Sequence, residues 1–189
     1  MAIDGKTICG SGNDKHKAYH VISAFVAENQ LTLGELTVEE KTNEITAVPE
    51  LLDLIDVKSE IVTADAMSCQ KKIIEKIIKK KADYTIGLKQ NQPTLYKDTE
   101  DYFNEFSADI PSKTTLDKGH RRIEKREYQL LTELSWLEQK DEWMGLKGLG
   151  CVKSTVKEKD ETREFTRYFI TSLADLDEFA DSVRKHWSI

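Results

Sequence analysis

Two aspartates stand where metal-dependent chemistry could take place. Asp4 lies within a short apolar segment at 2–8, and Asp65 ends a later apolar segment at 61–65. Functional side chains of open α/β sheets gather at strand ends, and a carboxylate among apolar residues is costly unless it binds something. Two carboxylates on adjacent strands would form an oxygen-rich site for Mg²⁺ or Mn²⁺, and a pair of such ions can promote phosphodiester cleavage. The residue pattern alone equally allows both aspartates to be solvated and without a chemical role.

The elements that must position these aspartates follow a recognisable order. Alternating and β-branched residues predict strands at 2–8, 19–26 and 31–38, joined as an antiparallel meander. Helical and strand periods then alternate, with a helix at 43–56, a strand at 61–66, a helix at 68–82, a strand at 84–88 and a helix at 93–106. This is the element order of the RNase H-like fold, so we expect an α/β protein with a mixed sheet flanked by helices.

A strand-rich stretch separates this pattern from the last helix. Strands are predicted within 114–131, 148–158 and 163–172, and a helix at 175–187. No internal repeat and no Pro/Gly-rich linker divides the sequence. We therefore expect a single domain over residues 1–189 with a β-rich insertion at about 111–162.

Composition favours a folded domain outside the membrane. Apolar residues make up 39% and charged residues 33% of the sequence. No apolar run approaches the roughly 20 residues that span a bilayer, and no basic-then-apolar leader precedes the first strand, so we expect a cytoplasmic protein without a membrane partner. Cys9, Cys69 and Cys151 are odd in number and widely spaced, which indicates reduced thiols and neither disulfides nor a zinc site. Cys69 is expected to be a small buried residue.

Charge is unevenly distributed along the chain. The net charge of −6 argues globally against a nucleic-acid partner, but basic residues concentrate at 71–81 and 118–126, and local patches set the field that DNA feels. The lysines of the first patch are expected to cover the outer face of an amphipathic helix. The second patch either contacts DNA phosphates or is a solvated surface. Its candidate DNA contacts are His120, Arg121, Arg122 and Arg126.

Other residues near the predicted site have less specific roles. Lys89 and Asn91 follow the strand at 84–88 and either contact a DNA strand or form a turn. Lys185, His186 and Trp187 are expected to pack at the end of the last helix, with Trp187 pointing inward.

Several segments, in this order, resemble motifs of bacterial insertion-sequence transposases of the kind encoded in H-repeat elements. The segments that carry the resemblance include 2–7 (AIDGKT), 62–70 (VTADAMSCQ), 88–93 (LKQNQP), 118–126 (KGHRRIEKR) and 184–189 (RKHWSI). The similarity extends from residue 2 to residue 189, and the order of the motifs makes it specific.

The resemblance implies the RNase H-like catalytic core of a DNA transposase, which cuts transposon ends and joins 3′ hydroxyls to target DNA with two Mg²⁺ or Mn²⁺ ions. Asp4 and Asp65 would be the first two metal-binding acids of an Asp-Asp-Glu triad, whose glutamate would fall immediately after Ile189. We therefore expect these residues alone to be inactive. The implied partners are transposon-end and target DNA, and further copies of the same chain.

Two other functions remain open from the sequence. One is a degenerate, non-catalytic transposon remnant with weak or no DNA binding, suggested by the missing third acid. The other is an aspartate-based phosphohydrolase, because residues 3–7 superficially resemble an Asp-x-Asp-Gly-Thr loop. Position 2 is alanine, however, so the nucleophile pair is incomplete, and the predicted meander fits a doubly wound hydrolase badly.

Overall fold

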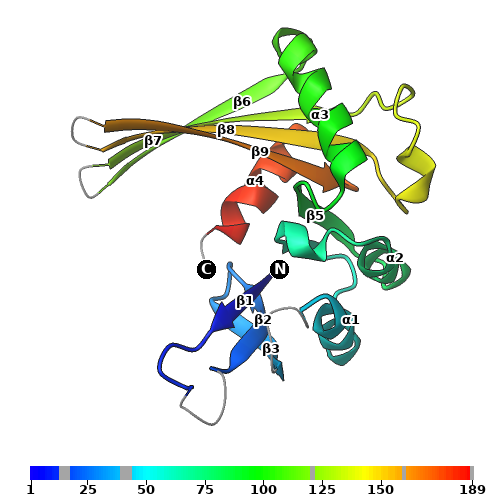
Figure 1. The fold of residues 1–189 in the computed structure, drawn as a ribbon, viewed down its shortest axis with the longest axis vertical. Coiled ribbons are helices and arrows are strands. Elements are labelled where there is room, and N and C mark those ends of the chain that lie inside the picture. The colour runs from blue at the N-terminus through cyan, green and yellow to red at the C-terminus, as the bar shows by residue number, and fades with distance from the viewer. Residues whose placement is uncertain (13–17, 39–43, 120–121, 159–160, 188–189) are drawn as a thin grey trace.

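A single mixed sheet organises the protein. The computed structural model describes residues 1–12, 18–38, 44–119, 122–158 and 161–187. Within them, nine strands form one sheet in the order β3-β2-β1-β4-β5-β9-β8-β7-β6 (Figure 1). The strands are β1 (Ala2–Thr7), β2 (His20–Val26), β3 (Leu31–Val38), β4 (Ile61–Ala64), β5 (Asp83–Leu88), β6 (Ser112–Gly119), β7 (Arg122–Leu131), β8 (Gly148–Glu158) and β9 (Glu161–Thr171). The helices are α1 (Glu44–Leu54), α2 (Lys71–Lys79), α3 (Pro93–Phe106) and α4 (Leu176–His186), with 3₁₀ turns η2 (Ala66–Ser68), η3 (Ser107–Asp109) and η4 (Lys140–Glu142).

The first five strands and their helices confirm the predicted RNase H-like order. β1, β2 and β3 form an antiparallel meander, and β4 and β5 run parallel to β1. The helix predicted at 68–82 is divided into η2 and α2, because Gln70 is extended and caps the start of α2. Ile73, Ile74 and Ile77 form the buried stripe of α2, as their spacing predicts.

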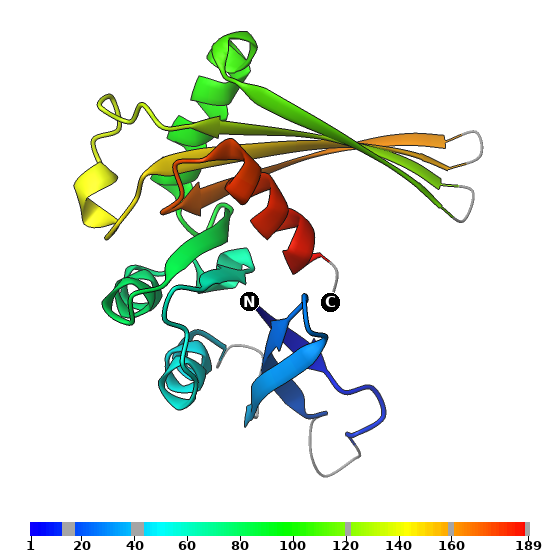
Figure 2. The ribbon, with the colours of Figure 1, turned by 180° about the vertical axis from the view of Figure 1, so that it is seen from behind.

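Alternation along the strands gives the sheet two apolar faces. Val62 and Ala64 point toward the larger core with α1, α2 and α3, and so do Tyr84 and Ile86 of β5. The opposite face carries a smaller core against α4, which includes Phe169 of β9. Figures 1 and 2 show α4 on one side of the sheet and α3 on the other.

The last four strands extend this sheet into an arm, the name used below for β6, β7, β8 and β9. The predicted strand region at 114–131 is in fact a hairpin of two strands, β6 and β7. β9 pairs with β8 along its whole length, but only residues 168–171 pair with β5. The rest of the arm therefore projects beyond the sheet core, as Figure 1 shows.

Helix α4 lies across the sheet between its core and the arm. Asp175 caps its start, because the carboxylate accepts hydrogen bonds from the backbone amides of Asp177 and Glu178. Ser182 donates to the Thr85 hydroxyl at 3.0 Å, so a buried hydroxyl pair ties the middle of α4 to β5. Gly150 of β8 leaves room for the Phe179 ring, since a Cβ at residue 150 would lie 2.2 Å from that ring.

We predict that Gly150→Ala lowers the free energy of unfolding by about 1–3 kcal/mol, because the added methyl overpacks the contact with Phe179. Denaturant unfolding measures this change. Gly119→Ala is the matched control, because a Cβ at that strand end would have no neighbour within 4 Å. Equal stability of the two variants would contradict the proposed close packing.

Candidate metal and nucleic-acid site

Asp4 and Asp65 belong to neighbouring parts of the sheet, β1 and the end of β4. The two strands are parallel, with Ala2 opposite Thr63 and Ile3 opposite Ala64, and continuing this register by one residue would set Asp4 opposite Asp65. Asp65 keeps an extended backbone beyond the end of β4, so both side chains point toward the α4 face of the sheet. The side chain of Asp4 is 26% exposed and that of Asp65 is 57% exposed, which leaves both accessible to a ligand.

His186 reaches Asp65 from the end of α4. Its Nδ1 lies 3.0 Å from the Thr63 hydroxyl, and its Nε2 lies 3.6 Å from a carboxylate oxygen of Asp65. The ring is buried, so α4 holds it in a fixed position against β4. From the sequence, His186 is expected only to pack at the end of the helix. Its spacing from Phe179 and Val183 could have indicated a further role, because this spacing places a polar ring on the buried face of the helix.

The prediction that Trp187 points inward is wrong. Its side chain is 49% exposed, and the indole packs edge-on against His186 with ring centroids 5.1 Å apart. The helix ends at His186, so Trp187 leaves the buried face of α4 and reaches the surface beside the aspartates.

The segment after Asp65 is held by contacts with the end of β5. Asn91 donates a hydrogen bond from its side-chain amide to the Ala66 carbonyl at 2.7 Å, and Gln92 donates to the Cys69 carbonyl at 2.8 Å. The backbone of Ala66 also approaches Gly87 closely, since a Cβ there would lie 3.1 Å from the Ala66 nitrogen. Asn91 thus positions the segment that follows Asp65.

A pocket of about 210 Å³ opens beside Asp65. Lys89 lines it just after the end of β5, which places this exposed cation near Asp65. The other lining residues are partly aromatic or basic and partly small or aliphatic. They include Tyr96, Arg167, His186 and Trp187.

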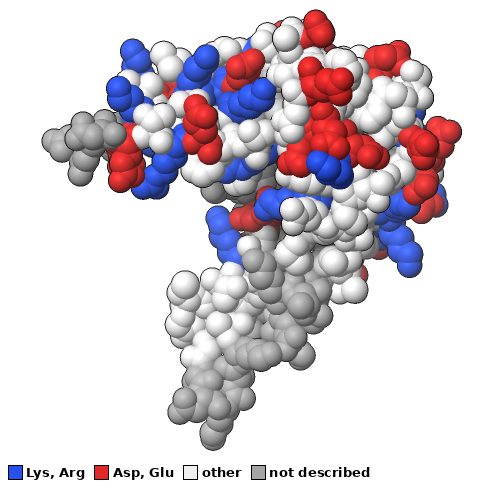
Figure 3. Space-filling model, turned by 45° about the horizontal axis from the view of Figure 1, so that its top comes forward, with Lys and Arg blue, Asp and Glu red and all other residues white. Residues whose placement is uncertain are grey.

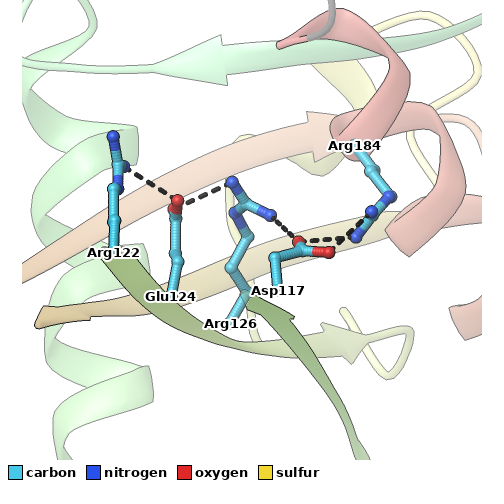
Figure 4. Close-up of polar contacts among 5 residues, drawn as sticks. All are labelled: Asp117, Arg122, Glu124, Arg126 and Arg184. Atoms are coloured by element: carbon cyan, nitrogen blue, oxygen red, sulfur yellow. Dashed lines mark hydrogen bonds and ion pairs between the residues drawn. The ribbon is translucent and has the colours of Figure 1, made fainter. Parts of the chain in front are cut away.

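The basic motif forms an ion-pair network on the α4 face of the arm (Figure 4). Arg126 binds Asp117 at 2.7 Å and Glu124 at 2.8 Å, and Arg122 binds the other oxygen of Glu124. Arg184 of α4 contacts both oxygens of Asp117, at 2.8 and 2.9 Å. The network therefore ties the arm to α4. His120 and Arg121, two of the predicted DNA contacts, lie outside the described residues.

Charge on the rest of the surface is mixed. Figure 3 shows Lys and Arg side chains on the arm with acidic side chains among them, and a concentration of Asp and Glu around α3. Several lysines of the 71–81 patch are paired, as in the contacts of Lys71 with Glu142 and Lys76 with Asp53. No helix of the described chain is long and apolar enough to cross a membrane.

The donor chemistry fits a hard divalent cation. Among the described residues, no group of three or more His, Cys, Asp or Glu side chains could hold a metal ion, so the candidate ligands are the two predicted carboxylates, Asp4 and Asp65. Mg²⁺ is commonly held by one or two carboxylates together with water and substrate phosphate, so two carboxylates suffice for its protein ligands.

Burial raises the pKa of the Cys69 and Cys151 thiols to about 12, which removes both as thiolate ligands or nucleophiles.

Comparison with known proteins gives consistent matches. The profile of a family described as "Transposase DDE domain" matches residues 1–189. "Putative transposase YncI" of Escherichia coli O157:H7 is 42% identical, over 100% of this chain and 51% of its own length. "H repeat-associated putative transposase YhhI" of Escherichia coli K12 is 41% identical, over 100% of this chain and 53% of its own length. The chain thus spans about half the length of these curated relatives.

Among solved structures, a piggyBac transposase synaptic complex with hairpin DNA aligns with a TM-score of 0.44 and 9% identity, covering 92% of this chain and 33% of that chain.

We predict that Asp117→Ala lowers the thermal midpoint by about 2–4 °C, as expected for a loss of about 1 kcal/mol from a partly exposed network. A hydrogen bond from Arg184 holds the pKa of Asp117 below its ordinary value of 3.8. The stabilisation is therefore fully present above pH 3.8 and is lost as the pH falls through the lowered pKa.

Thermal unfolding at several pH values measures this effect. Glu161→Ala serves as the control, because it removes an exposed pair with Arg163 that does not involve α4. Equal midpoints for the two variants at neutral pH would show that the network does not fasten α4 to the arm.

Proposed function

Because the chain belongs to the family of transposase DDE domains, we propose that Asp4 and Asp65 bind the divalent metal ion used in DNA strand cleavage and strand transfer. The observation that supports this most is the parallel register of β1 and β4, because its continuation by one residue would bring both carboxylates to the same level on one face of the sheet. The preferred ion is Mg²⁺ or Mn²⁺, because the donors are carboxylate oxygens. When bound, such an ion activates a water and stabilises a leaving 3′ oxygen.

The residues of this chain would act mainly by positioning. His186 and Thr63 form a buried pair beside Asp65, so that α4 limits the movement of that carboxylate. Asn91 fixes the backbone that follows Asp65. Lys6, whose ammonium lies 3.6 Å from Asp4, offsets part of the negative charge at the site. A site held in this way costs little reorganisation when substrate binds.

The proposed macromolecular partner is DNA. Three lysines of the arm, Lys118, Lys125 and Lys157, have no carboxylate partner among the residues that the structure describes. The strand register places them on the face of the arm opposite α4, so they add positive potential around the arm and are not contacts beside the aspartates. Since the arm and the aspartates are parts of one sheet, DNA bound along the arm would lie at a defined distance from Asp4 and Asp65.

We predict that Asp4→Ala and Asp65→Ala each weaken Mn²⁺ binding at least about tenfold, because each variant removes one of two carboxylate ligands. Isothermal titration calorimetry of the 189-residue chain measures this. Glu50→Ala is the control, since it removes an exposed carboxylate from α1. Unchanged affinity in both aspartate variants would refute the metal site and favour a non-catalytic remnant.

A further inference from the structure

Arg167 occupies a special position on β9. It lies on the α4 face of the arm, directly opposite Val152 of β8 and two residues from Phe169 of the smaller core. Its side chain is half-buried. Its sequence context gives no signal of a special role, because it lies in an alternating strand without an adjacent basic residue.

Among the described arginines, Arg167 alone has no carboxylate partner. Each of the others forms an ion pair, either in the network of Asp117 and Glu124 or with Glu161. The guanidinium of Arg167 instead lies over aromatic rings, 4.9 Å from the centroid of Trp187 and 5.7 Å from that of Phe165. Stacking covers the faces of a guanidinium and leaves its in-plane N–H donors available for an oxyanion.

Two hollows of the surface meet at this side chain. One is the pocket of about 210 Å³ that Asp65 and Lys89 also line. The other, of about 300 Å³, lies between the arm and α4, and is lined by Arg122, Glu124 and Arg126 of β7 and by Val183 of α4. Arg167 and Trp187 line both hollows, so they lie between Asp65 and the ion-pair network of the arm.

From this arrangement we infer that Arg167 binds the DNA phosphate next to the one held at Asp4 and Asp65, with Trp187 as its supporting platform. The inference rests on the proposed function, because the aspartates define where the reacting phosphate lies. A planar guanidinium with free in-plane donors matches the oxygens of a phosphodiester, whereas Lys89 supplies a less directional charge. Arg167 is a positioning residue, since it aligns the strand and leaves the metal ligands untouched.

The test is DNA binding by fluorescence anisotropy across a series of salt concentrations, with a short fluorescein-labelled duplex that has a single-stranded overhang. Loss of one phosphate contact reduces the slope of log K against log salt by about 0.9, which weakens binding about eightfold at about 0.1 M salt. We expect this result for Arg167→Ala. Arg167→Lys should keep the slope and lose less affinity, because it retains the charge without the planar fork.

Arg163→Ala is the matched control. Arg163 lies on the same face of the same strand but pairs with Glu161, so its removal should leave the slope nearly unchanged. Mn²⁺ affinity should be unchanged in Arg167→Ala, and its thermal midpoint shows that the variant is folded.

Several outcomes would overturn the inference. These are a wild-type chain that does not bind the duplex, an Arg167→Ala variant with wild-type slope and affinity, and equal losses in Arg167→Ala and Arg163→Ala. The proposed function fails separately. If Asp4→Ala and Asp65→Ala bound Mn²⁺ normally while Arg167→Ala lost its phosphate contact, the metal site would be refuted and the DNA contact would stand.

Discussion

The docking of α4 on the sheet is the contact on which the site depends. A hydroxyl pair between Ser182 and Thr85, and a ring seated over Gly150, fix the helix between the sheet core and the arm. Its last turn then carries His186 to Asp65, and Arg184 reaches Asp117 on β6. One helix thus contacts the carboxylates and the basic motif at once. Without the packing of α4, the carboxylates and the basic motif, which lie far apart in sequence, would no longer be held in a fixed arrangement.

The site combines two kinds of determinant. Strand register supplies the carboxylates, because parallel neighbours bring residues from β1 and β4 to the same level of the sheet. Long-range packing supplies everything around them, including His186 from α4, Arg167 from β9 and Asn91 from the turn after β5. Small structural changes in the arm would leave the positions of the carboxylates unchanged. The same changes would displace the basic and aromatic residues that line the pocket.

Much of the fold was predictable because it follows local periodicity. The alternation in β2 and the isoleucine stripe of α2 are repeated signals, and the family match confirms the resemblance to H-repeat transposases. The division of this region into β6 and β7 was less clear, since the alternating sequence pattern does not mark where one strand ends and the next begins. Pro49 lies inside α1, where tertiary packing outweighs its local preference. The contacts of His186 and Arg167 were not predictable, because their partners are distant in sequence.

The shared strand β9 has a mechanical consequence. Its carboxyl-terminal residues belong to the ladder with β5, while its whole length belongs to the ladder with β8. Through β9, the arm and the sheet core are connected by continuous main-chain hydrogen bonding. The two parts must therefore bend as one unit. The arm would therefore be stiff. A force applied to it would be transmitted to β5, and to the backbone beside Asp65, as a twist of the sheet.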